Sequence, residues 1–344
     1  MLTAPMALVY FVTKACNCAC AHCFYWESLN NPRDRELSLD EIRKIAAKTG
    51  QILYLRLSGG EPFIRTDLFE LVGVFVKECG PSYVGIPSNG FFTDRVADFA
   101  KKAARLNTRL EIGISIDDIG AGHDRIRKCP GLYEKAIKSF ETLKELKKTS
   151  KNLGVGFIVT VMKSNLGRLE DIFDTLSALE PDSIACNIVR DDTKKANEKN
   201  IDMVLADRFA RKCDRYNESV SRVGETFFDK MRRVKTLEAH KIRERTIKTN
   251  RFQIPCVAGD KIVVMYPEGE VAPCETLKDV IGNVRDFDYD MKKLLKSPRA
   301  VQIRKKIVDE KCFCTHECFT TADIVFNRWL LFKIMIKSLF PVKI

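Results

Sequence analysis

The sequence predicts an α/β fold: a partial (β/α)6 barrel of the TIM type, followed by a small cysteine-rich module of a β-hairpin and helices. Six short apolar segments alternate with helical patterns between residue 8 and about residue 190. Such alternation is typical of parallel strands joined by right-handed crossovers. Six units rather than eight indicate a barrel that stays open. The composition then changes, because residues 251–320 carry five of the 13 cysteines.

Each element of the barrel has its own local signal. The strands are expected at residues 8–13, 52–57, 83–88, 110–117, 153–161 and 183–189. The helices are expected at residues 38–50, 66–80, 93–106, 131–148 and 167–180, and a long helical region from about 202. The first helix is the best defined, because Ser38 and Glu41 form a capping box and Gly50 follows its end.

The remaining chain divides at changes in pattern. Residues 254–277 are expected to form a hairpin that turns at 267–269, with a cysteine on each side. The final segment is apolar with interspersed basic residues, and the two internal lysines make it a poor membrane span. We therefore expect a barrel at 1–205, a helical linker at 206–250, the cysteine-rich module at 251–320 and a C-terminal apolar-basic helix at 321–344.

Charge and cysteine content narrow the class of protein. The net charge of +12 is densest between residues 194 and 251, which reads as solvated helix surface, and no specific nucleic-acid partner is expected. The start of the chain lacks the pattern of a signal peptide, so a cytoplasmic location is expected. A cytoplasmic chain rich in cysteine binds metal more often than it forms disulfides. Four isolated cysteines are expected to be small buried hydrophobes: Cys79, Cys129, Cys186 and Cys213.

Polar motifs follow all six predicted strands. In parallel barrels the carboxyl ends of the strands build the active site, so these motifs are expected on one rim. The motifs are the cysteine loop at 13–26, Ser-Gly-Gly-Glu-Pro at 58–62, Ser-Asn-Gly at 88–90, Ser115 with Asp117, Thr160 with Asn165, and Asn187 with Arg190.

Cys16, Cys20 and Cys23 have the spacing Cys-x-x-x-Cys-x-x-Cys, and three thiolates can hold three irons of a [4Fe–4S] cube. A structural zinc site is the competing interpretation, but zinc needs four ligands, so Cys18 would have to join. With the motifs at 58–62, 88–90 and 115–117, the sequence resembles the radical S-adenosylmethionine (SAM) enzymes. In that resemblance Cys18 occupies a variable position and is a bystander.

The resemblance implies a set of SAM contacts. The loop backbone at Gly59 and Gly60, with Glu61, would hold the ammonium group. An arginine after the fourth strand would meet the carboxylate, and Arg127 is favoured over Arg125. His22 stands where the family usually has an aromatic ring near adenine, and Phe24 and Tyr25 would share that role. The full expected set is Phe24, Gly59, Gly60, Glu61, Asn89, Ser115, Asp117 and Arg127, and no side chain is assigned as catalytic.

The second cysteine group resembles the SPASM/twitch extension of the same superfamily. Its pattern is a cysteine, then Gly-x-x-x-x-Cys, then a later cluster. The matching residues are Cys256, Gly269 with Cys274, and Cys312, Cys314 and Cys318. Five cysteines can ligate one auxiliary [4Fe–4S] cluster but not two. Cys256, Cys274 and Cys318 are the expected ligands, together with either Cys312 or Cys314.

The resemblance implies an enzyme that cleaves SAM reductively and takes a hydrogen atom from a substrate. One auxiliary cluster would suit a net two-electron oxidation. The expected partners are an external one-electron reductant of the flavodoxin or ferredoxin type and a small polar or glycan-type substrate. The alternatives are a ribosomal-peptide maturase with a separate recognition partner and a non-catalytic iron–sulfur scaffold. The C-terminal helix is expected to pack on the barrel, with a peripheral membrane contact as the alternative.

Overall fold

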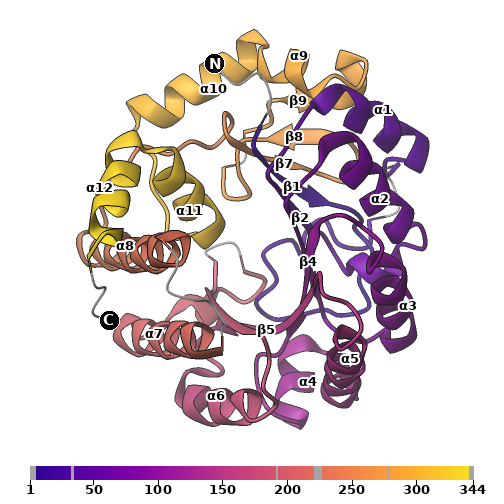
Figure 1. Ribbon diagram of the computed structural model, residues 1–344, viewed down its shortest axis with the longest axis vertical. Coiled ribbons are helices and arrows are strands. Elements are labelled where there is room, and N and C mark those ends of the chain that lie inside the picture. The colour runs from indigo at the N-terminus through magenta and orange to yellow at the C-terminus, as the bar shows by residue number, and fades with distance from the viewer. Residues whose placement is uncertain (1–4, 32–34, 191–192, 221–226, 278, 341–344) are drawn as a thin grey trace.

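The computed structural model describes residues 5–31, 35–190, 193–220, 227–277 and 279–340. Residues 1–4 of the predicted barrel segment, 221–226 of the linker and 341–344 of the final helix lie outside the described residues. Within the described part, one curved sheet runs through the molecule and helices cover its outer side (Figure 1).

The sheet has nine strands in the order β6-β5-β4-β3-β2-β1-β7-β8-β9. The first six are parallel and follow the chain order, which confirms the predicted half-barrel. The strands are β1 (Ala7–Phe11), β2 (Tyr54–Ser58), β3 (Tyr83–Ser88), β4 (Arg109–Ser115), β5 (Leu153–Val161), β6 (Ser183–Ile188), β7 (Ile262–Met265), β8 (Glu270–Ala272) and β9 (Gly282–Asn283).

The predicted barrel helices are all present, with ends that differ by a few residues. Three helices were not predicted: the short α4 and α9, and the longer α10, although α10 begins with a recognisable Ser297 cap and Pro298. The helices are α1 (Leu39–Thr49), α2 (Leu68–Cys79), α3 (Thr93–Ala103), α4 (Ala121–Arg127), α5 (Leu132–Lys147), α6 (Leu169–Ser177), α7 (Met203–Val220), α8 (Phe227–Thr249), α9 (Met291–Leu295), α10 (Pro298–Asp309), α11 (Glu317–Phe326) and α12 (Arg328–Ser338).

The C-terminal hairpin extends the barrel sheet. Strand β7 pairs in parallel with β1, with Val9 opposite Val264. Strands β8 and β9 then continue in antiparallel fashion. The turn falls at residues 267–269 as predicted, and Gly269 has a φ of +90°, where glycine is favoured. Strand β1 therefore lies between the barrel and the module, and its residues from Leu8 to Phe11 are buried.

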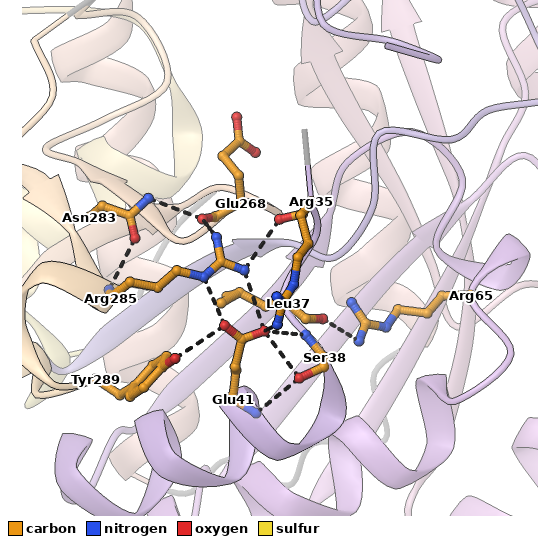
Figure 2. A network of polar contacts seen from close by, with 9 residues as sticks. All are labelled: Arg35, Leu37, Ser38, Glu41, Arg65, Glu268, Asn283, Arg285 and Tyr289. Carbon is orange, nitrogen blue, oxygen red and sulfur yellow. Dashed lines mark hydrogen bonds and ion pairs between the residues drawn. The ribbon is translucent and has the colours of Figure 1, made fainter. Parts of the chain in front are cut away.

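A polar network joins α1 to the module (Figure 2). Glu41 closes the predicted capping box with Ser38. Its carboxylate also accepts hydrogen bonds from Arg285 Nε at 2.7 Å and from the Tyr289 hydroxyl at 3.2 Å. The Arg285 guanidinium donates to the carbonyl oxygen of Glu268 at 2.6 Å as well. Hydrogen bonds from Arg285 and Ser38 hold the pKa of Glu41 well below its usual range, so this carboxylate stays ionised.

Glu41→Gln is expected to lower the free energy of unfolding by about 2–3 kcal/mol at pH 7, since it leaves Arg285 without its charged partner. The folded pKa is depressed, so the contribution of Glu41 is complete above the unfolded pKa of about 4.3 and is lost as the pH falls further. Urea unfolding of the wild-type protein and of Glu41→Gln at pH 7 and pH 3.5 measures the difference in their free energies of unfolding. The difference between them should shrink at pH 3.5, and a constant difference would contradict the assignment.

Four isolated cysteines are buried, as predicted: Cys79, Cys129, Cys186 and Cys213. Of the described helices, none is both long enough and apolar enough to cross a bilayer.

Candidate active site

The loop that follows β1 carries the four clustered cysteines, and the end of α4 holds it in place. The backbone N–H groups of Ala19 and Ala21 donate to the carbonyl oxygens of Arg127 and Ile126 at 3.2 and 3.0 Å. The Asn30 side chain accepts from the N–H of Cys16 at 2.9 Å. An unpredicted helix and an asparagine downstream of the motif thus fix the path of the loop.

Cys16, Cys20 and Cys23 are half-buried, whereas Cys18 is buried against Cys129 and Leu132. A hydrogen bond from the Cys18 thiol lowers the pKa of Cys20 to about 6, and the nearby Arg127 acts in the same direction. Burial raises the pKa of Cys23 to about 12. Cys20 is therefore the thiol whose surroundings most favour a thiolate.

In the described ranges, no three Cys, His, Asp or Glu side chains converge where a single metal ion could sit. A [4Fe–4S] cube does not require such convergence, because each thiolate binds a different iron. The donor set itself fits a cube, since three thiols on one short loop supply three of its four ligands.

Gly59 and Gly60 lie against the cysteine loop. The N–H of Gly60 donates to Thr13 O, and the N–H of Glu61 donates to Ala15 O, both at 2.8 Å. A Cβ atom on Gly60 would lie 2.1 Å from Ala15 O, and Gly59 has a φ of +125°. The glycines therefore allow two protein loops to approach each other closely, which is a structural reason in addition to the predicted approach to SAM.

Gly60→Ala is expected to lower the free energy of unfolding by about 1–3 kcal/mol and to displace the cysteine loop, because the new methyl group meets backbone that cannot move aside. The matched control is Gly73→Ala in α2, where the added Cβ meets nothing within 4 Å. Alanine in a helix should stabilise there by about 0.5–1 kcal/mol. Thermal unfolding of the two variants measures the difference, and equal shifts would contradict the packing argument.

Glu61 joins the loops after β2 and β3. It is buried, and its Oε1 accepts from the Ser88 hydroxyl at 2.9 Å and from the N–H of Phe63 at 3.1 Å. Its Oε2 accepts from the N–H of Asn89 at 2.7 Å. Burial raises the pKa of Glu61 to about 7. Protein donors thus contact both carboxylate oxygens.

Asn89 connects the third loop to the cysteine loop. Its Nδ2 donates to Asn17 Oδ1 at 2.8 Å and lies 3.4 Å from Cys18 Sγ. Its Oδ1 accepts from the N–H of Phe91 at 2.9 Å. Asn89 and Glu61 therefore bring the first three motifs together on one rim, as the strand order predicted.

Asp117 and Arg127, both predicted to contact SAM, form a buried ion pair with each other. Asp117 Oδ2 lies 2.8 Å from Arg127 Nε and 2.7 Å from Arg127 Nη2. His22 Nε2 lies 3.5 Å from the same oxygen. Burial raises the pKa of Asp117, but Arg127, His22 and His123 outweigh it and bring the pKa below its usual value. The exposed Arg125 takes no part in this pair.

Two residues that sequence reasoning missed or left unassigned hold the Asp117 backbone. His123 Nδ1 accepts from the N–H of Asp117 at 3.1 Å, and burial lowers the pKa of His123 to about 3, which keeps it neutral. Asn165 Nδ2 donates to Asp117 O at 2.8 Å, and the N–H of Thr160 donates to Asp117 Oδ1 at 2.9 Å. The rim position of Thr160 and Asn165 was a usable signal, but a lone histidine in a seven-residue helix was not.

The other predicted contacts lie nearby in the fold. Ser115 is half-buried at the end of β4. The guanidinium of Arg190 lies over the Phe24 ring, 3.8 Å from its centre, and it also forms an ion pair with Glu275 of the module. Tyr25 is buried in the core and stacks on Tyr266. Phe24 thus lies where the barrel meets the module, whereas Tyr25 is a core residue.

Electrostatic influences on the pKa link four of the five C-terminal cysteines, and the fifth, Cys318, contacts a barrel strand. The pKa of Cys256 is raised by burial and by the nearby Cys312 and Cys314, and Cys274 acts on Cys312 and Cys314 in the same way. Cys318 Sγ instead accepts from Arg56 Nη1 of β2 at 3.3 Å. Arg56 could have been found from the sequence, because it is a charged residue inside the short apolar strand at 54–58.

A parallel half-barrel with a three-cysteine loop after its first strand, and a glycine-rich loop docked on it, defines a radical SAM enzyme. Residues 10–180 match the family model of the Radical SAM superfamily. The chain belongs to this superfamily, whose members use SAM and a [4Fe–4S] cluster, and these are its cofactors.

Three curated relatives show how the similarity is distributed. The Fe-coproporphyrin III synthase of Methanosarcina barkeri is 31% identical over 49% of this chain and 40% of its own length. The mycofactocin maturase MftC of Mycolicibacterium smegmatis is 29% identical over 52% of this chain and 43% of its own length. The AdoMet-dependent heme synthase of M. barkeri is 23% identical over 84% of this chain and 82% of its own length. The chain thus spans less than half of the first two proteins and most of the third.

Solved structures share the fold. SuiB of Streptococcus suis, bound to the precursor peptide SuiA, aligns with a TM-score of 0.59 at 16% identity over 88% of this chain and 67% of its own. AnSMEcpe with bound AdoMet aligns with a TM-score of 0.61 at 17% identity over 95% of this chain and 87% of its own. The maturases and heme synthases among these proteins agree with the SPASM/twitch subgroup.

Proposed function

We propose that Cys16, Cys20 and Cys23 hold the [4Fe–4S] cluster and leave its fourth iron for the amino and carboxylate groups of SAM. The support is the loop geometry: three half-buried thiols on one segment, the more deeply buried Cys18 between them, and the cationic Arg127 beside Cys20. When bound, the cluster and SAM supply an electron and a 5′-deoxyadenosyl radical that takes a hydrogen atom from the substrate.

The protein residues bind and orient. We propose that the backbone of Gly59 and Gly60 faces the methionine part of SAM, with Glu61 fixing the loop through its three hydrogen bonds. Asn89 and Ser115 would lie toward the adenosyl part. The Asp117–Arg127 pair would shape the pocket as a unit, because each charge already has a buried partner.

We propose one auxiliary [4Fe–4S] cluster on Cys256, Cys274, Cys312 and Cys314. The support is the electrostatic influence that links these four thiols and the separate contact of Cys318 with Arg56. This assignment takes both Cys312 and Cys314 and omits Cys318, unlike the ligand set expected from the resemblance. Such a cluster, when bound, supplies a one-electron acceptor suited to a net two-electron oxidation.

Cys318→Ala is expected to keep the iron content of the reconstituted protein at the wild-type value, because Cys318 is outside the proposed ligand set. Cys314→Ala, the matched substitution four residues earlier, should lose the auxiliary cluster and about half of the iron, since a [4Fe–4S] cluster needs its cysteine ligands. Iron and sulfide analysis of both variants measures this. If Cys318→Ala lost iron and Cys314→Ala retained it, the ligand set expected from the resemblance, which includes Cys318, would be correct.

For the substrate, we propose a peptide. The maturase relative and the fold shared with SuiB, which is a peptide-bound structure, support this class. A tetrapyrrole is the second candidate, because the heme synthase is the relative matched over most of both chains. Neither supports the glycan-type molecule expected from the sequence. An external one-electron reductant of the flavodoxin or ferredoxin type and a cytoplasmic location complete the proposal.

The test is anaerobic incubation of the reconstituted protein with dithionite and SAM. Formation of 5′-deoxyadenosine is expected, and its absence in protein with a full iron content would indicate a non-catalytic iron–sulfur scaffold. Fe-coproporphyrin III and a panel of precursor peptides are then added separately. A peptide that raises the yield and transfers deuterium to 5′-deoxyadenosine supports the proposal, whereas stimulation by the tetrapyrrole alone supports the second candidate.

A further inference from the structure

The C-terminal helix α12 presents an apolar face to solvent. Its inner side packs on α8, where Ile334 is buried in a cluster with Val234 and Ile242. Its outer side and the residues that follow it carry large exposed side chains. They are Trp329 (74% exposed), Phe332 (60%), Met335 (42%), Ile336 (43%), Leu339 (64%) and Phe340 (63%), and we call this set the α12 face.

The α12 face is a continuous surface. Residues 329, 332, 336 and 339 follow the three- and four-residue spacing that places side chains on one side of a helix. The Asn327 side chain caps the start of α12 by accepting from the N–H of Leu330 at 3.0 Å, so the helix begins at a defined point. Large exposed apolar patches mark interaction surfaces. The sequence predicted packing on the barrel, but α12 packs on α8 and α11 instead, and this contact accounts for only one side of the helix.

Helices α8 and α12, which pack on each other, carry an excess of basic residues. Helix α8 carries eight Lys and Arg residues against three Asp and Glu, and α12 carries three basic residues and no acidic one. The buried Glu238 of α8 joins the two helices, with Lys333 Nζ at 3.2 Å and Lys337 Nζ at 2.7 Å. In Figure 1 the two helices lie side by side, with α11 next to both. The α8–α12 pair thus combines exposed aromatic rings on α12 with an excess of positive charge over the two helices.

We propose that the α12 face docks on an anionic membrane surface, with α12 lying in the interface. Aromatic and aliphatic side chains enter the headgroup boundary of such a surface, while lysines and arginines attract its anionic lipids. A second copy of the chain fits less well, because a symmetric contact would bring two basic α8–α12 pairs together. Nucleic acid would neutralise the charge but leave the apolar side chains uncovered. The inference is independent of the substrate proposal, since it concerns a surface and not the SAM site.

The test is flotation of the reconstituted full chain with two kinds of vesicle, pure phosphatidylcholine and phosphatidylcholine with phosphatidylserine. Binding to the anionic vesicles is expected to be at least about tenfold stronger and to weaken with salt. In a Trp26→Phe background, Trp329 is the remaining tryptophan, and its emission should shift to the blue on binding.

Trp329→Ser with Phe332→Ser is expected to lower the partition coefficient by about tenfold or more. The matched control is Val301→Ser with Val308→Ser, which removes two exposed apolar side chains from α10 and should leave binding unchanged. Circular dichroism establishes that both variants fold. Three results would overturn the proposal. The protein could bind both kinds of vesicle equally, or Trp329→Ser/Phe332→Ser could still bind. The protein could also bind neither vesicle and sediment as a dimer that this double variant abolishes.

Discussion

Cys20→Ala is expected to reduce 5′-deoxyadenosine formation to background, whereas Cys18→Ala should leave it largely intact. The two residues are two positions apart on the same loop, but their surroundings differ. Cys20 is half-buried, and a hydrogen bond from the Cys18 thiol and the nearby guanidinium of Arg127 favour its thiolate form. Cys18 is buried against Cys129 and Leu132, where alanine can replace it at small cost.

The measurement combines iron analysis with product detection under reducing, anaerobic conditions. Cys20→Ala should lack the SAM-binding cluster and retain the auxiliary one, so its iron content falls by about half, as expected for the loss of one ligand of a [4Fe–4S] centre. Cys18→Ala should keep the wild-type iron content. Product formation by Cys20→Ala at the wild-type rate, or its complete loss in folded Cys18→Ala, would show that the ligand set is wrong.

Asp117→Asn is expected to lower the free energy of unfolding by about 3–5 kcal/mol, because it leaves the buried Arg127 charge without its partner. The substitution preserves the shape of the side chain, so packing changes little. The end of α4 also holds the cysteine loop through the Arg127 and Ile126 carbonyl groups. Loss of stability should therefore be accompanied by weaker retention of iron.

Urea denaturation of the apoprotein measures the change in the free energy of unfolding without any contribution from bound cofactors. Asp98→Asn serves as the control, since its ion pair with Lys102 is exposed and should contribute little to stability. Adding Arg127→Gln to Asp117→Asn should recover part of the loss, because the pair is coupled. A double variant as unstable as the sum of the two single ones would contradict a direct interaction.

The parts of the fold that local pattern dictates could be predicted from the sequence. Six apolar strands alternating with helices gave the parallel order of β1–β6, and Ser38 with Glu41 gave the start of α1. The insertion of β7 beside β1 could not be predicted, since the two segments are far apart in sequence and no local rule links them.

The site shows the same division. The spacing of the cysteines identified the loop, and the strand ends placed Glu61, Asn89 and Asp117 on one rim. Their partners were beyond reach, because a sequence shows that Asp117 and Arg127 are charged but not that they face each other. Arg56 was overlooked for a related reason: its contact with Cys318 joins positions 262 residues apart.

Strand β1 has the barrel on one edge and the hairpin on the other, and the cysteine loop begins where it ends. Because β1 forms backbone hydrogen bonds on both edges, it belongs to both the barrel and the C-terminal module, which the sequence pattern separates. Opening of the hairpin would thus loosen the root of the loop, and the two regions should melt together as one cooperative unit. A ligand or partner that binds the hairpin should therefore change the geometry of Cys16, Cys20 and Cys23, although it does not contact them.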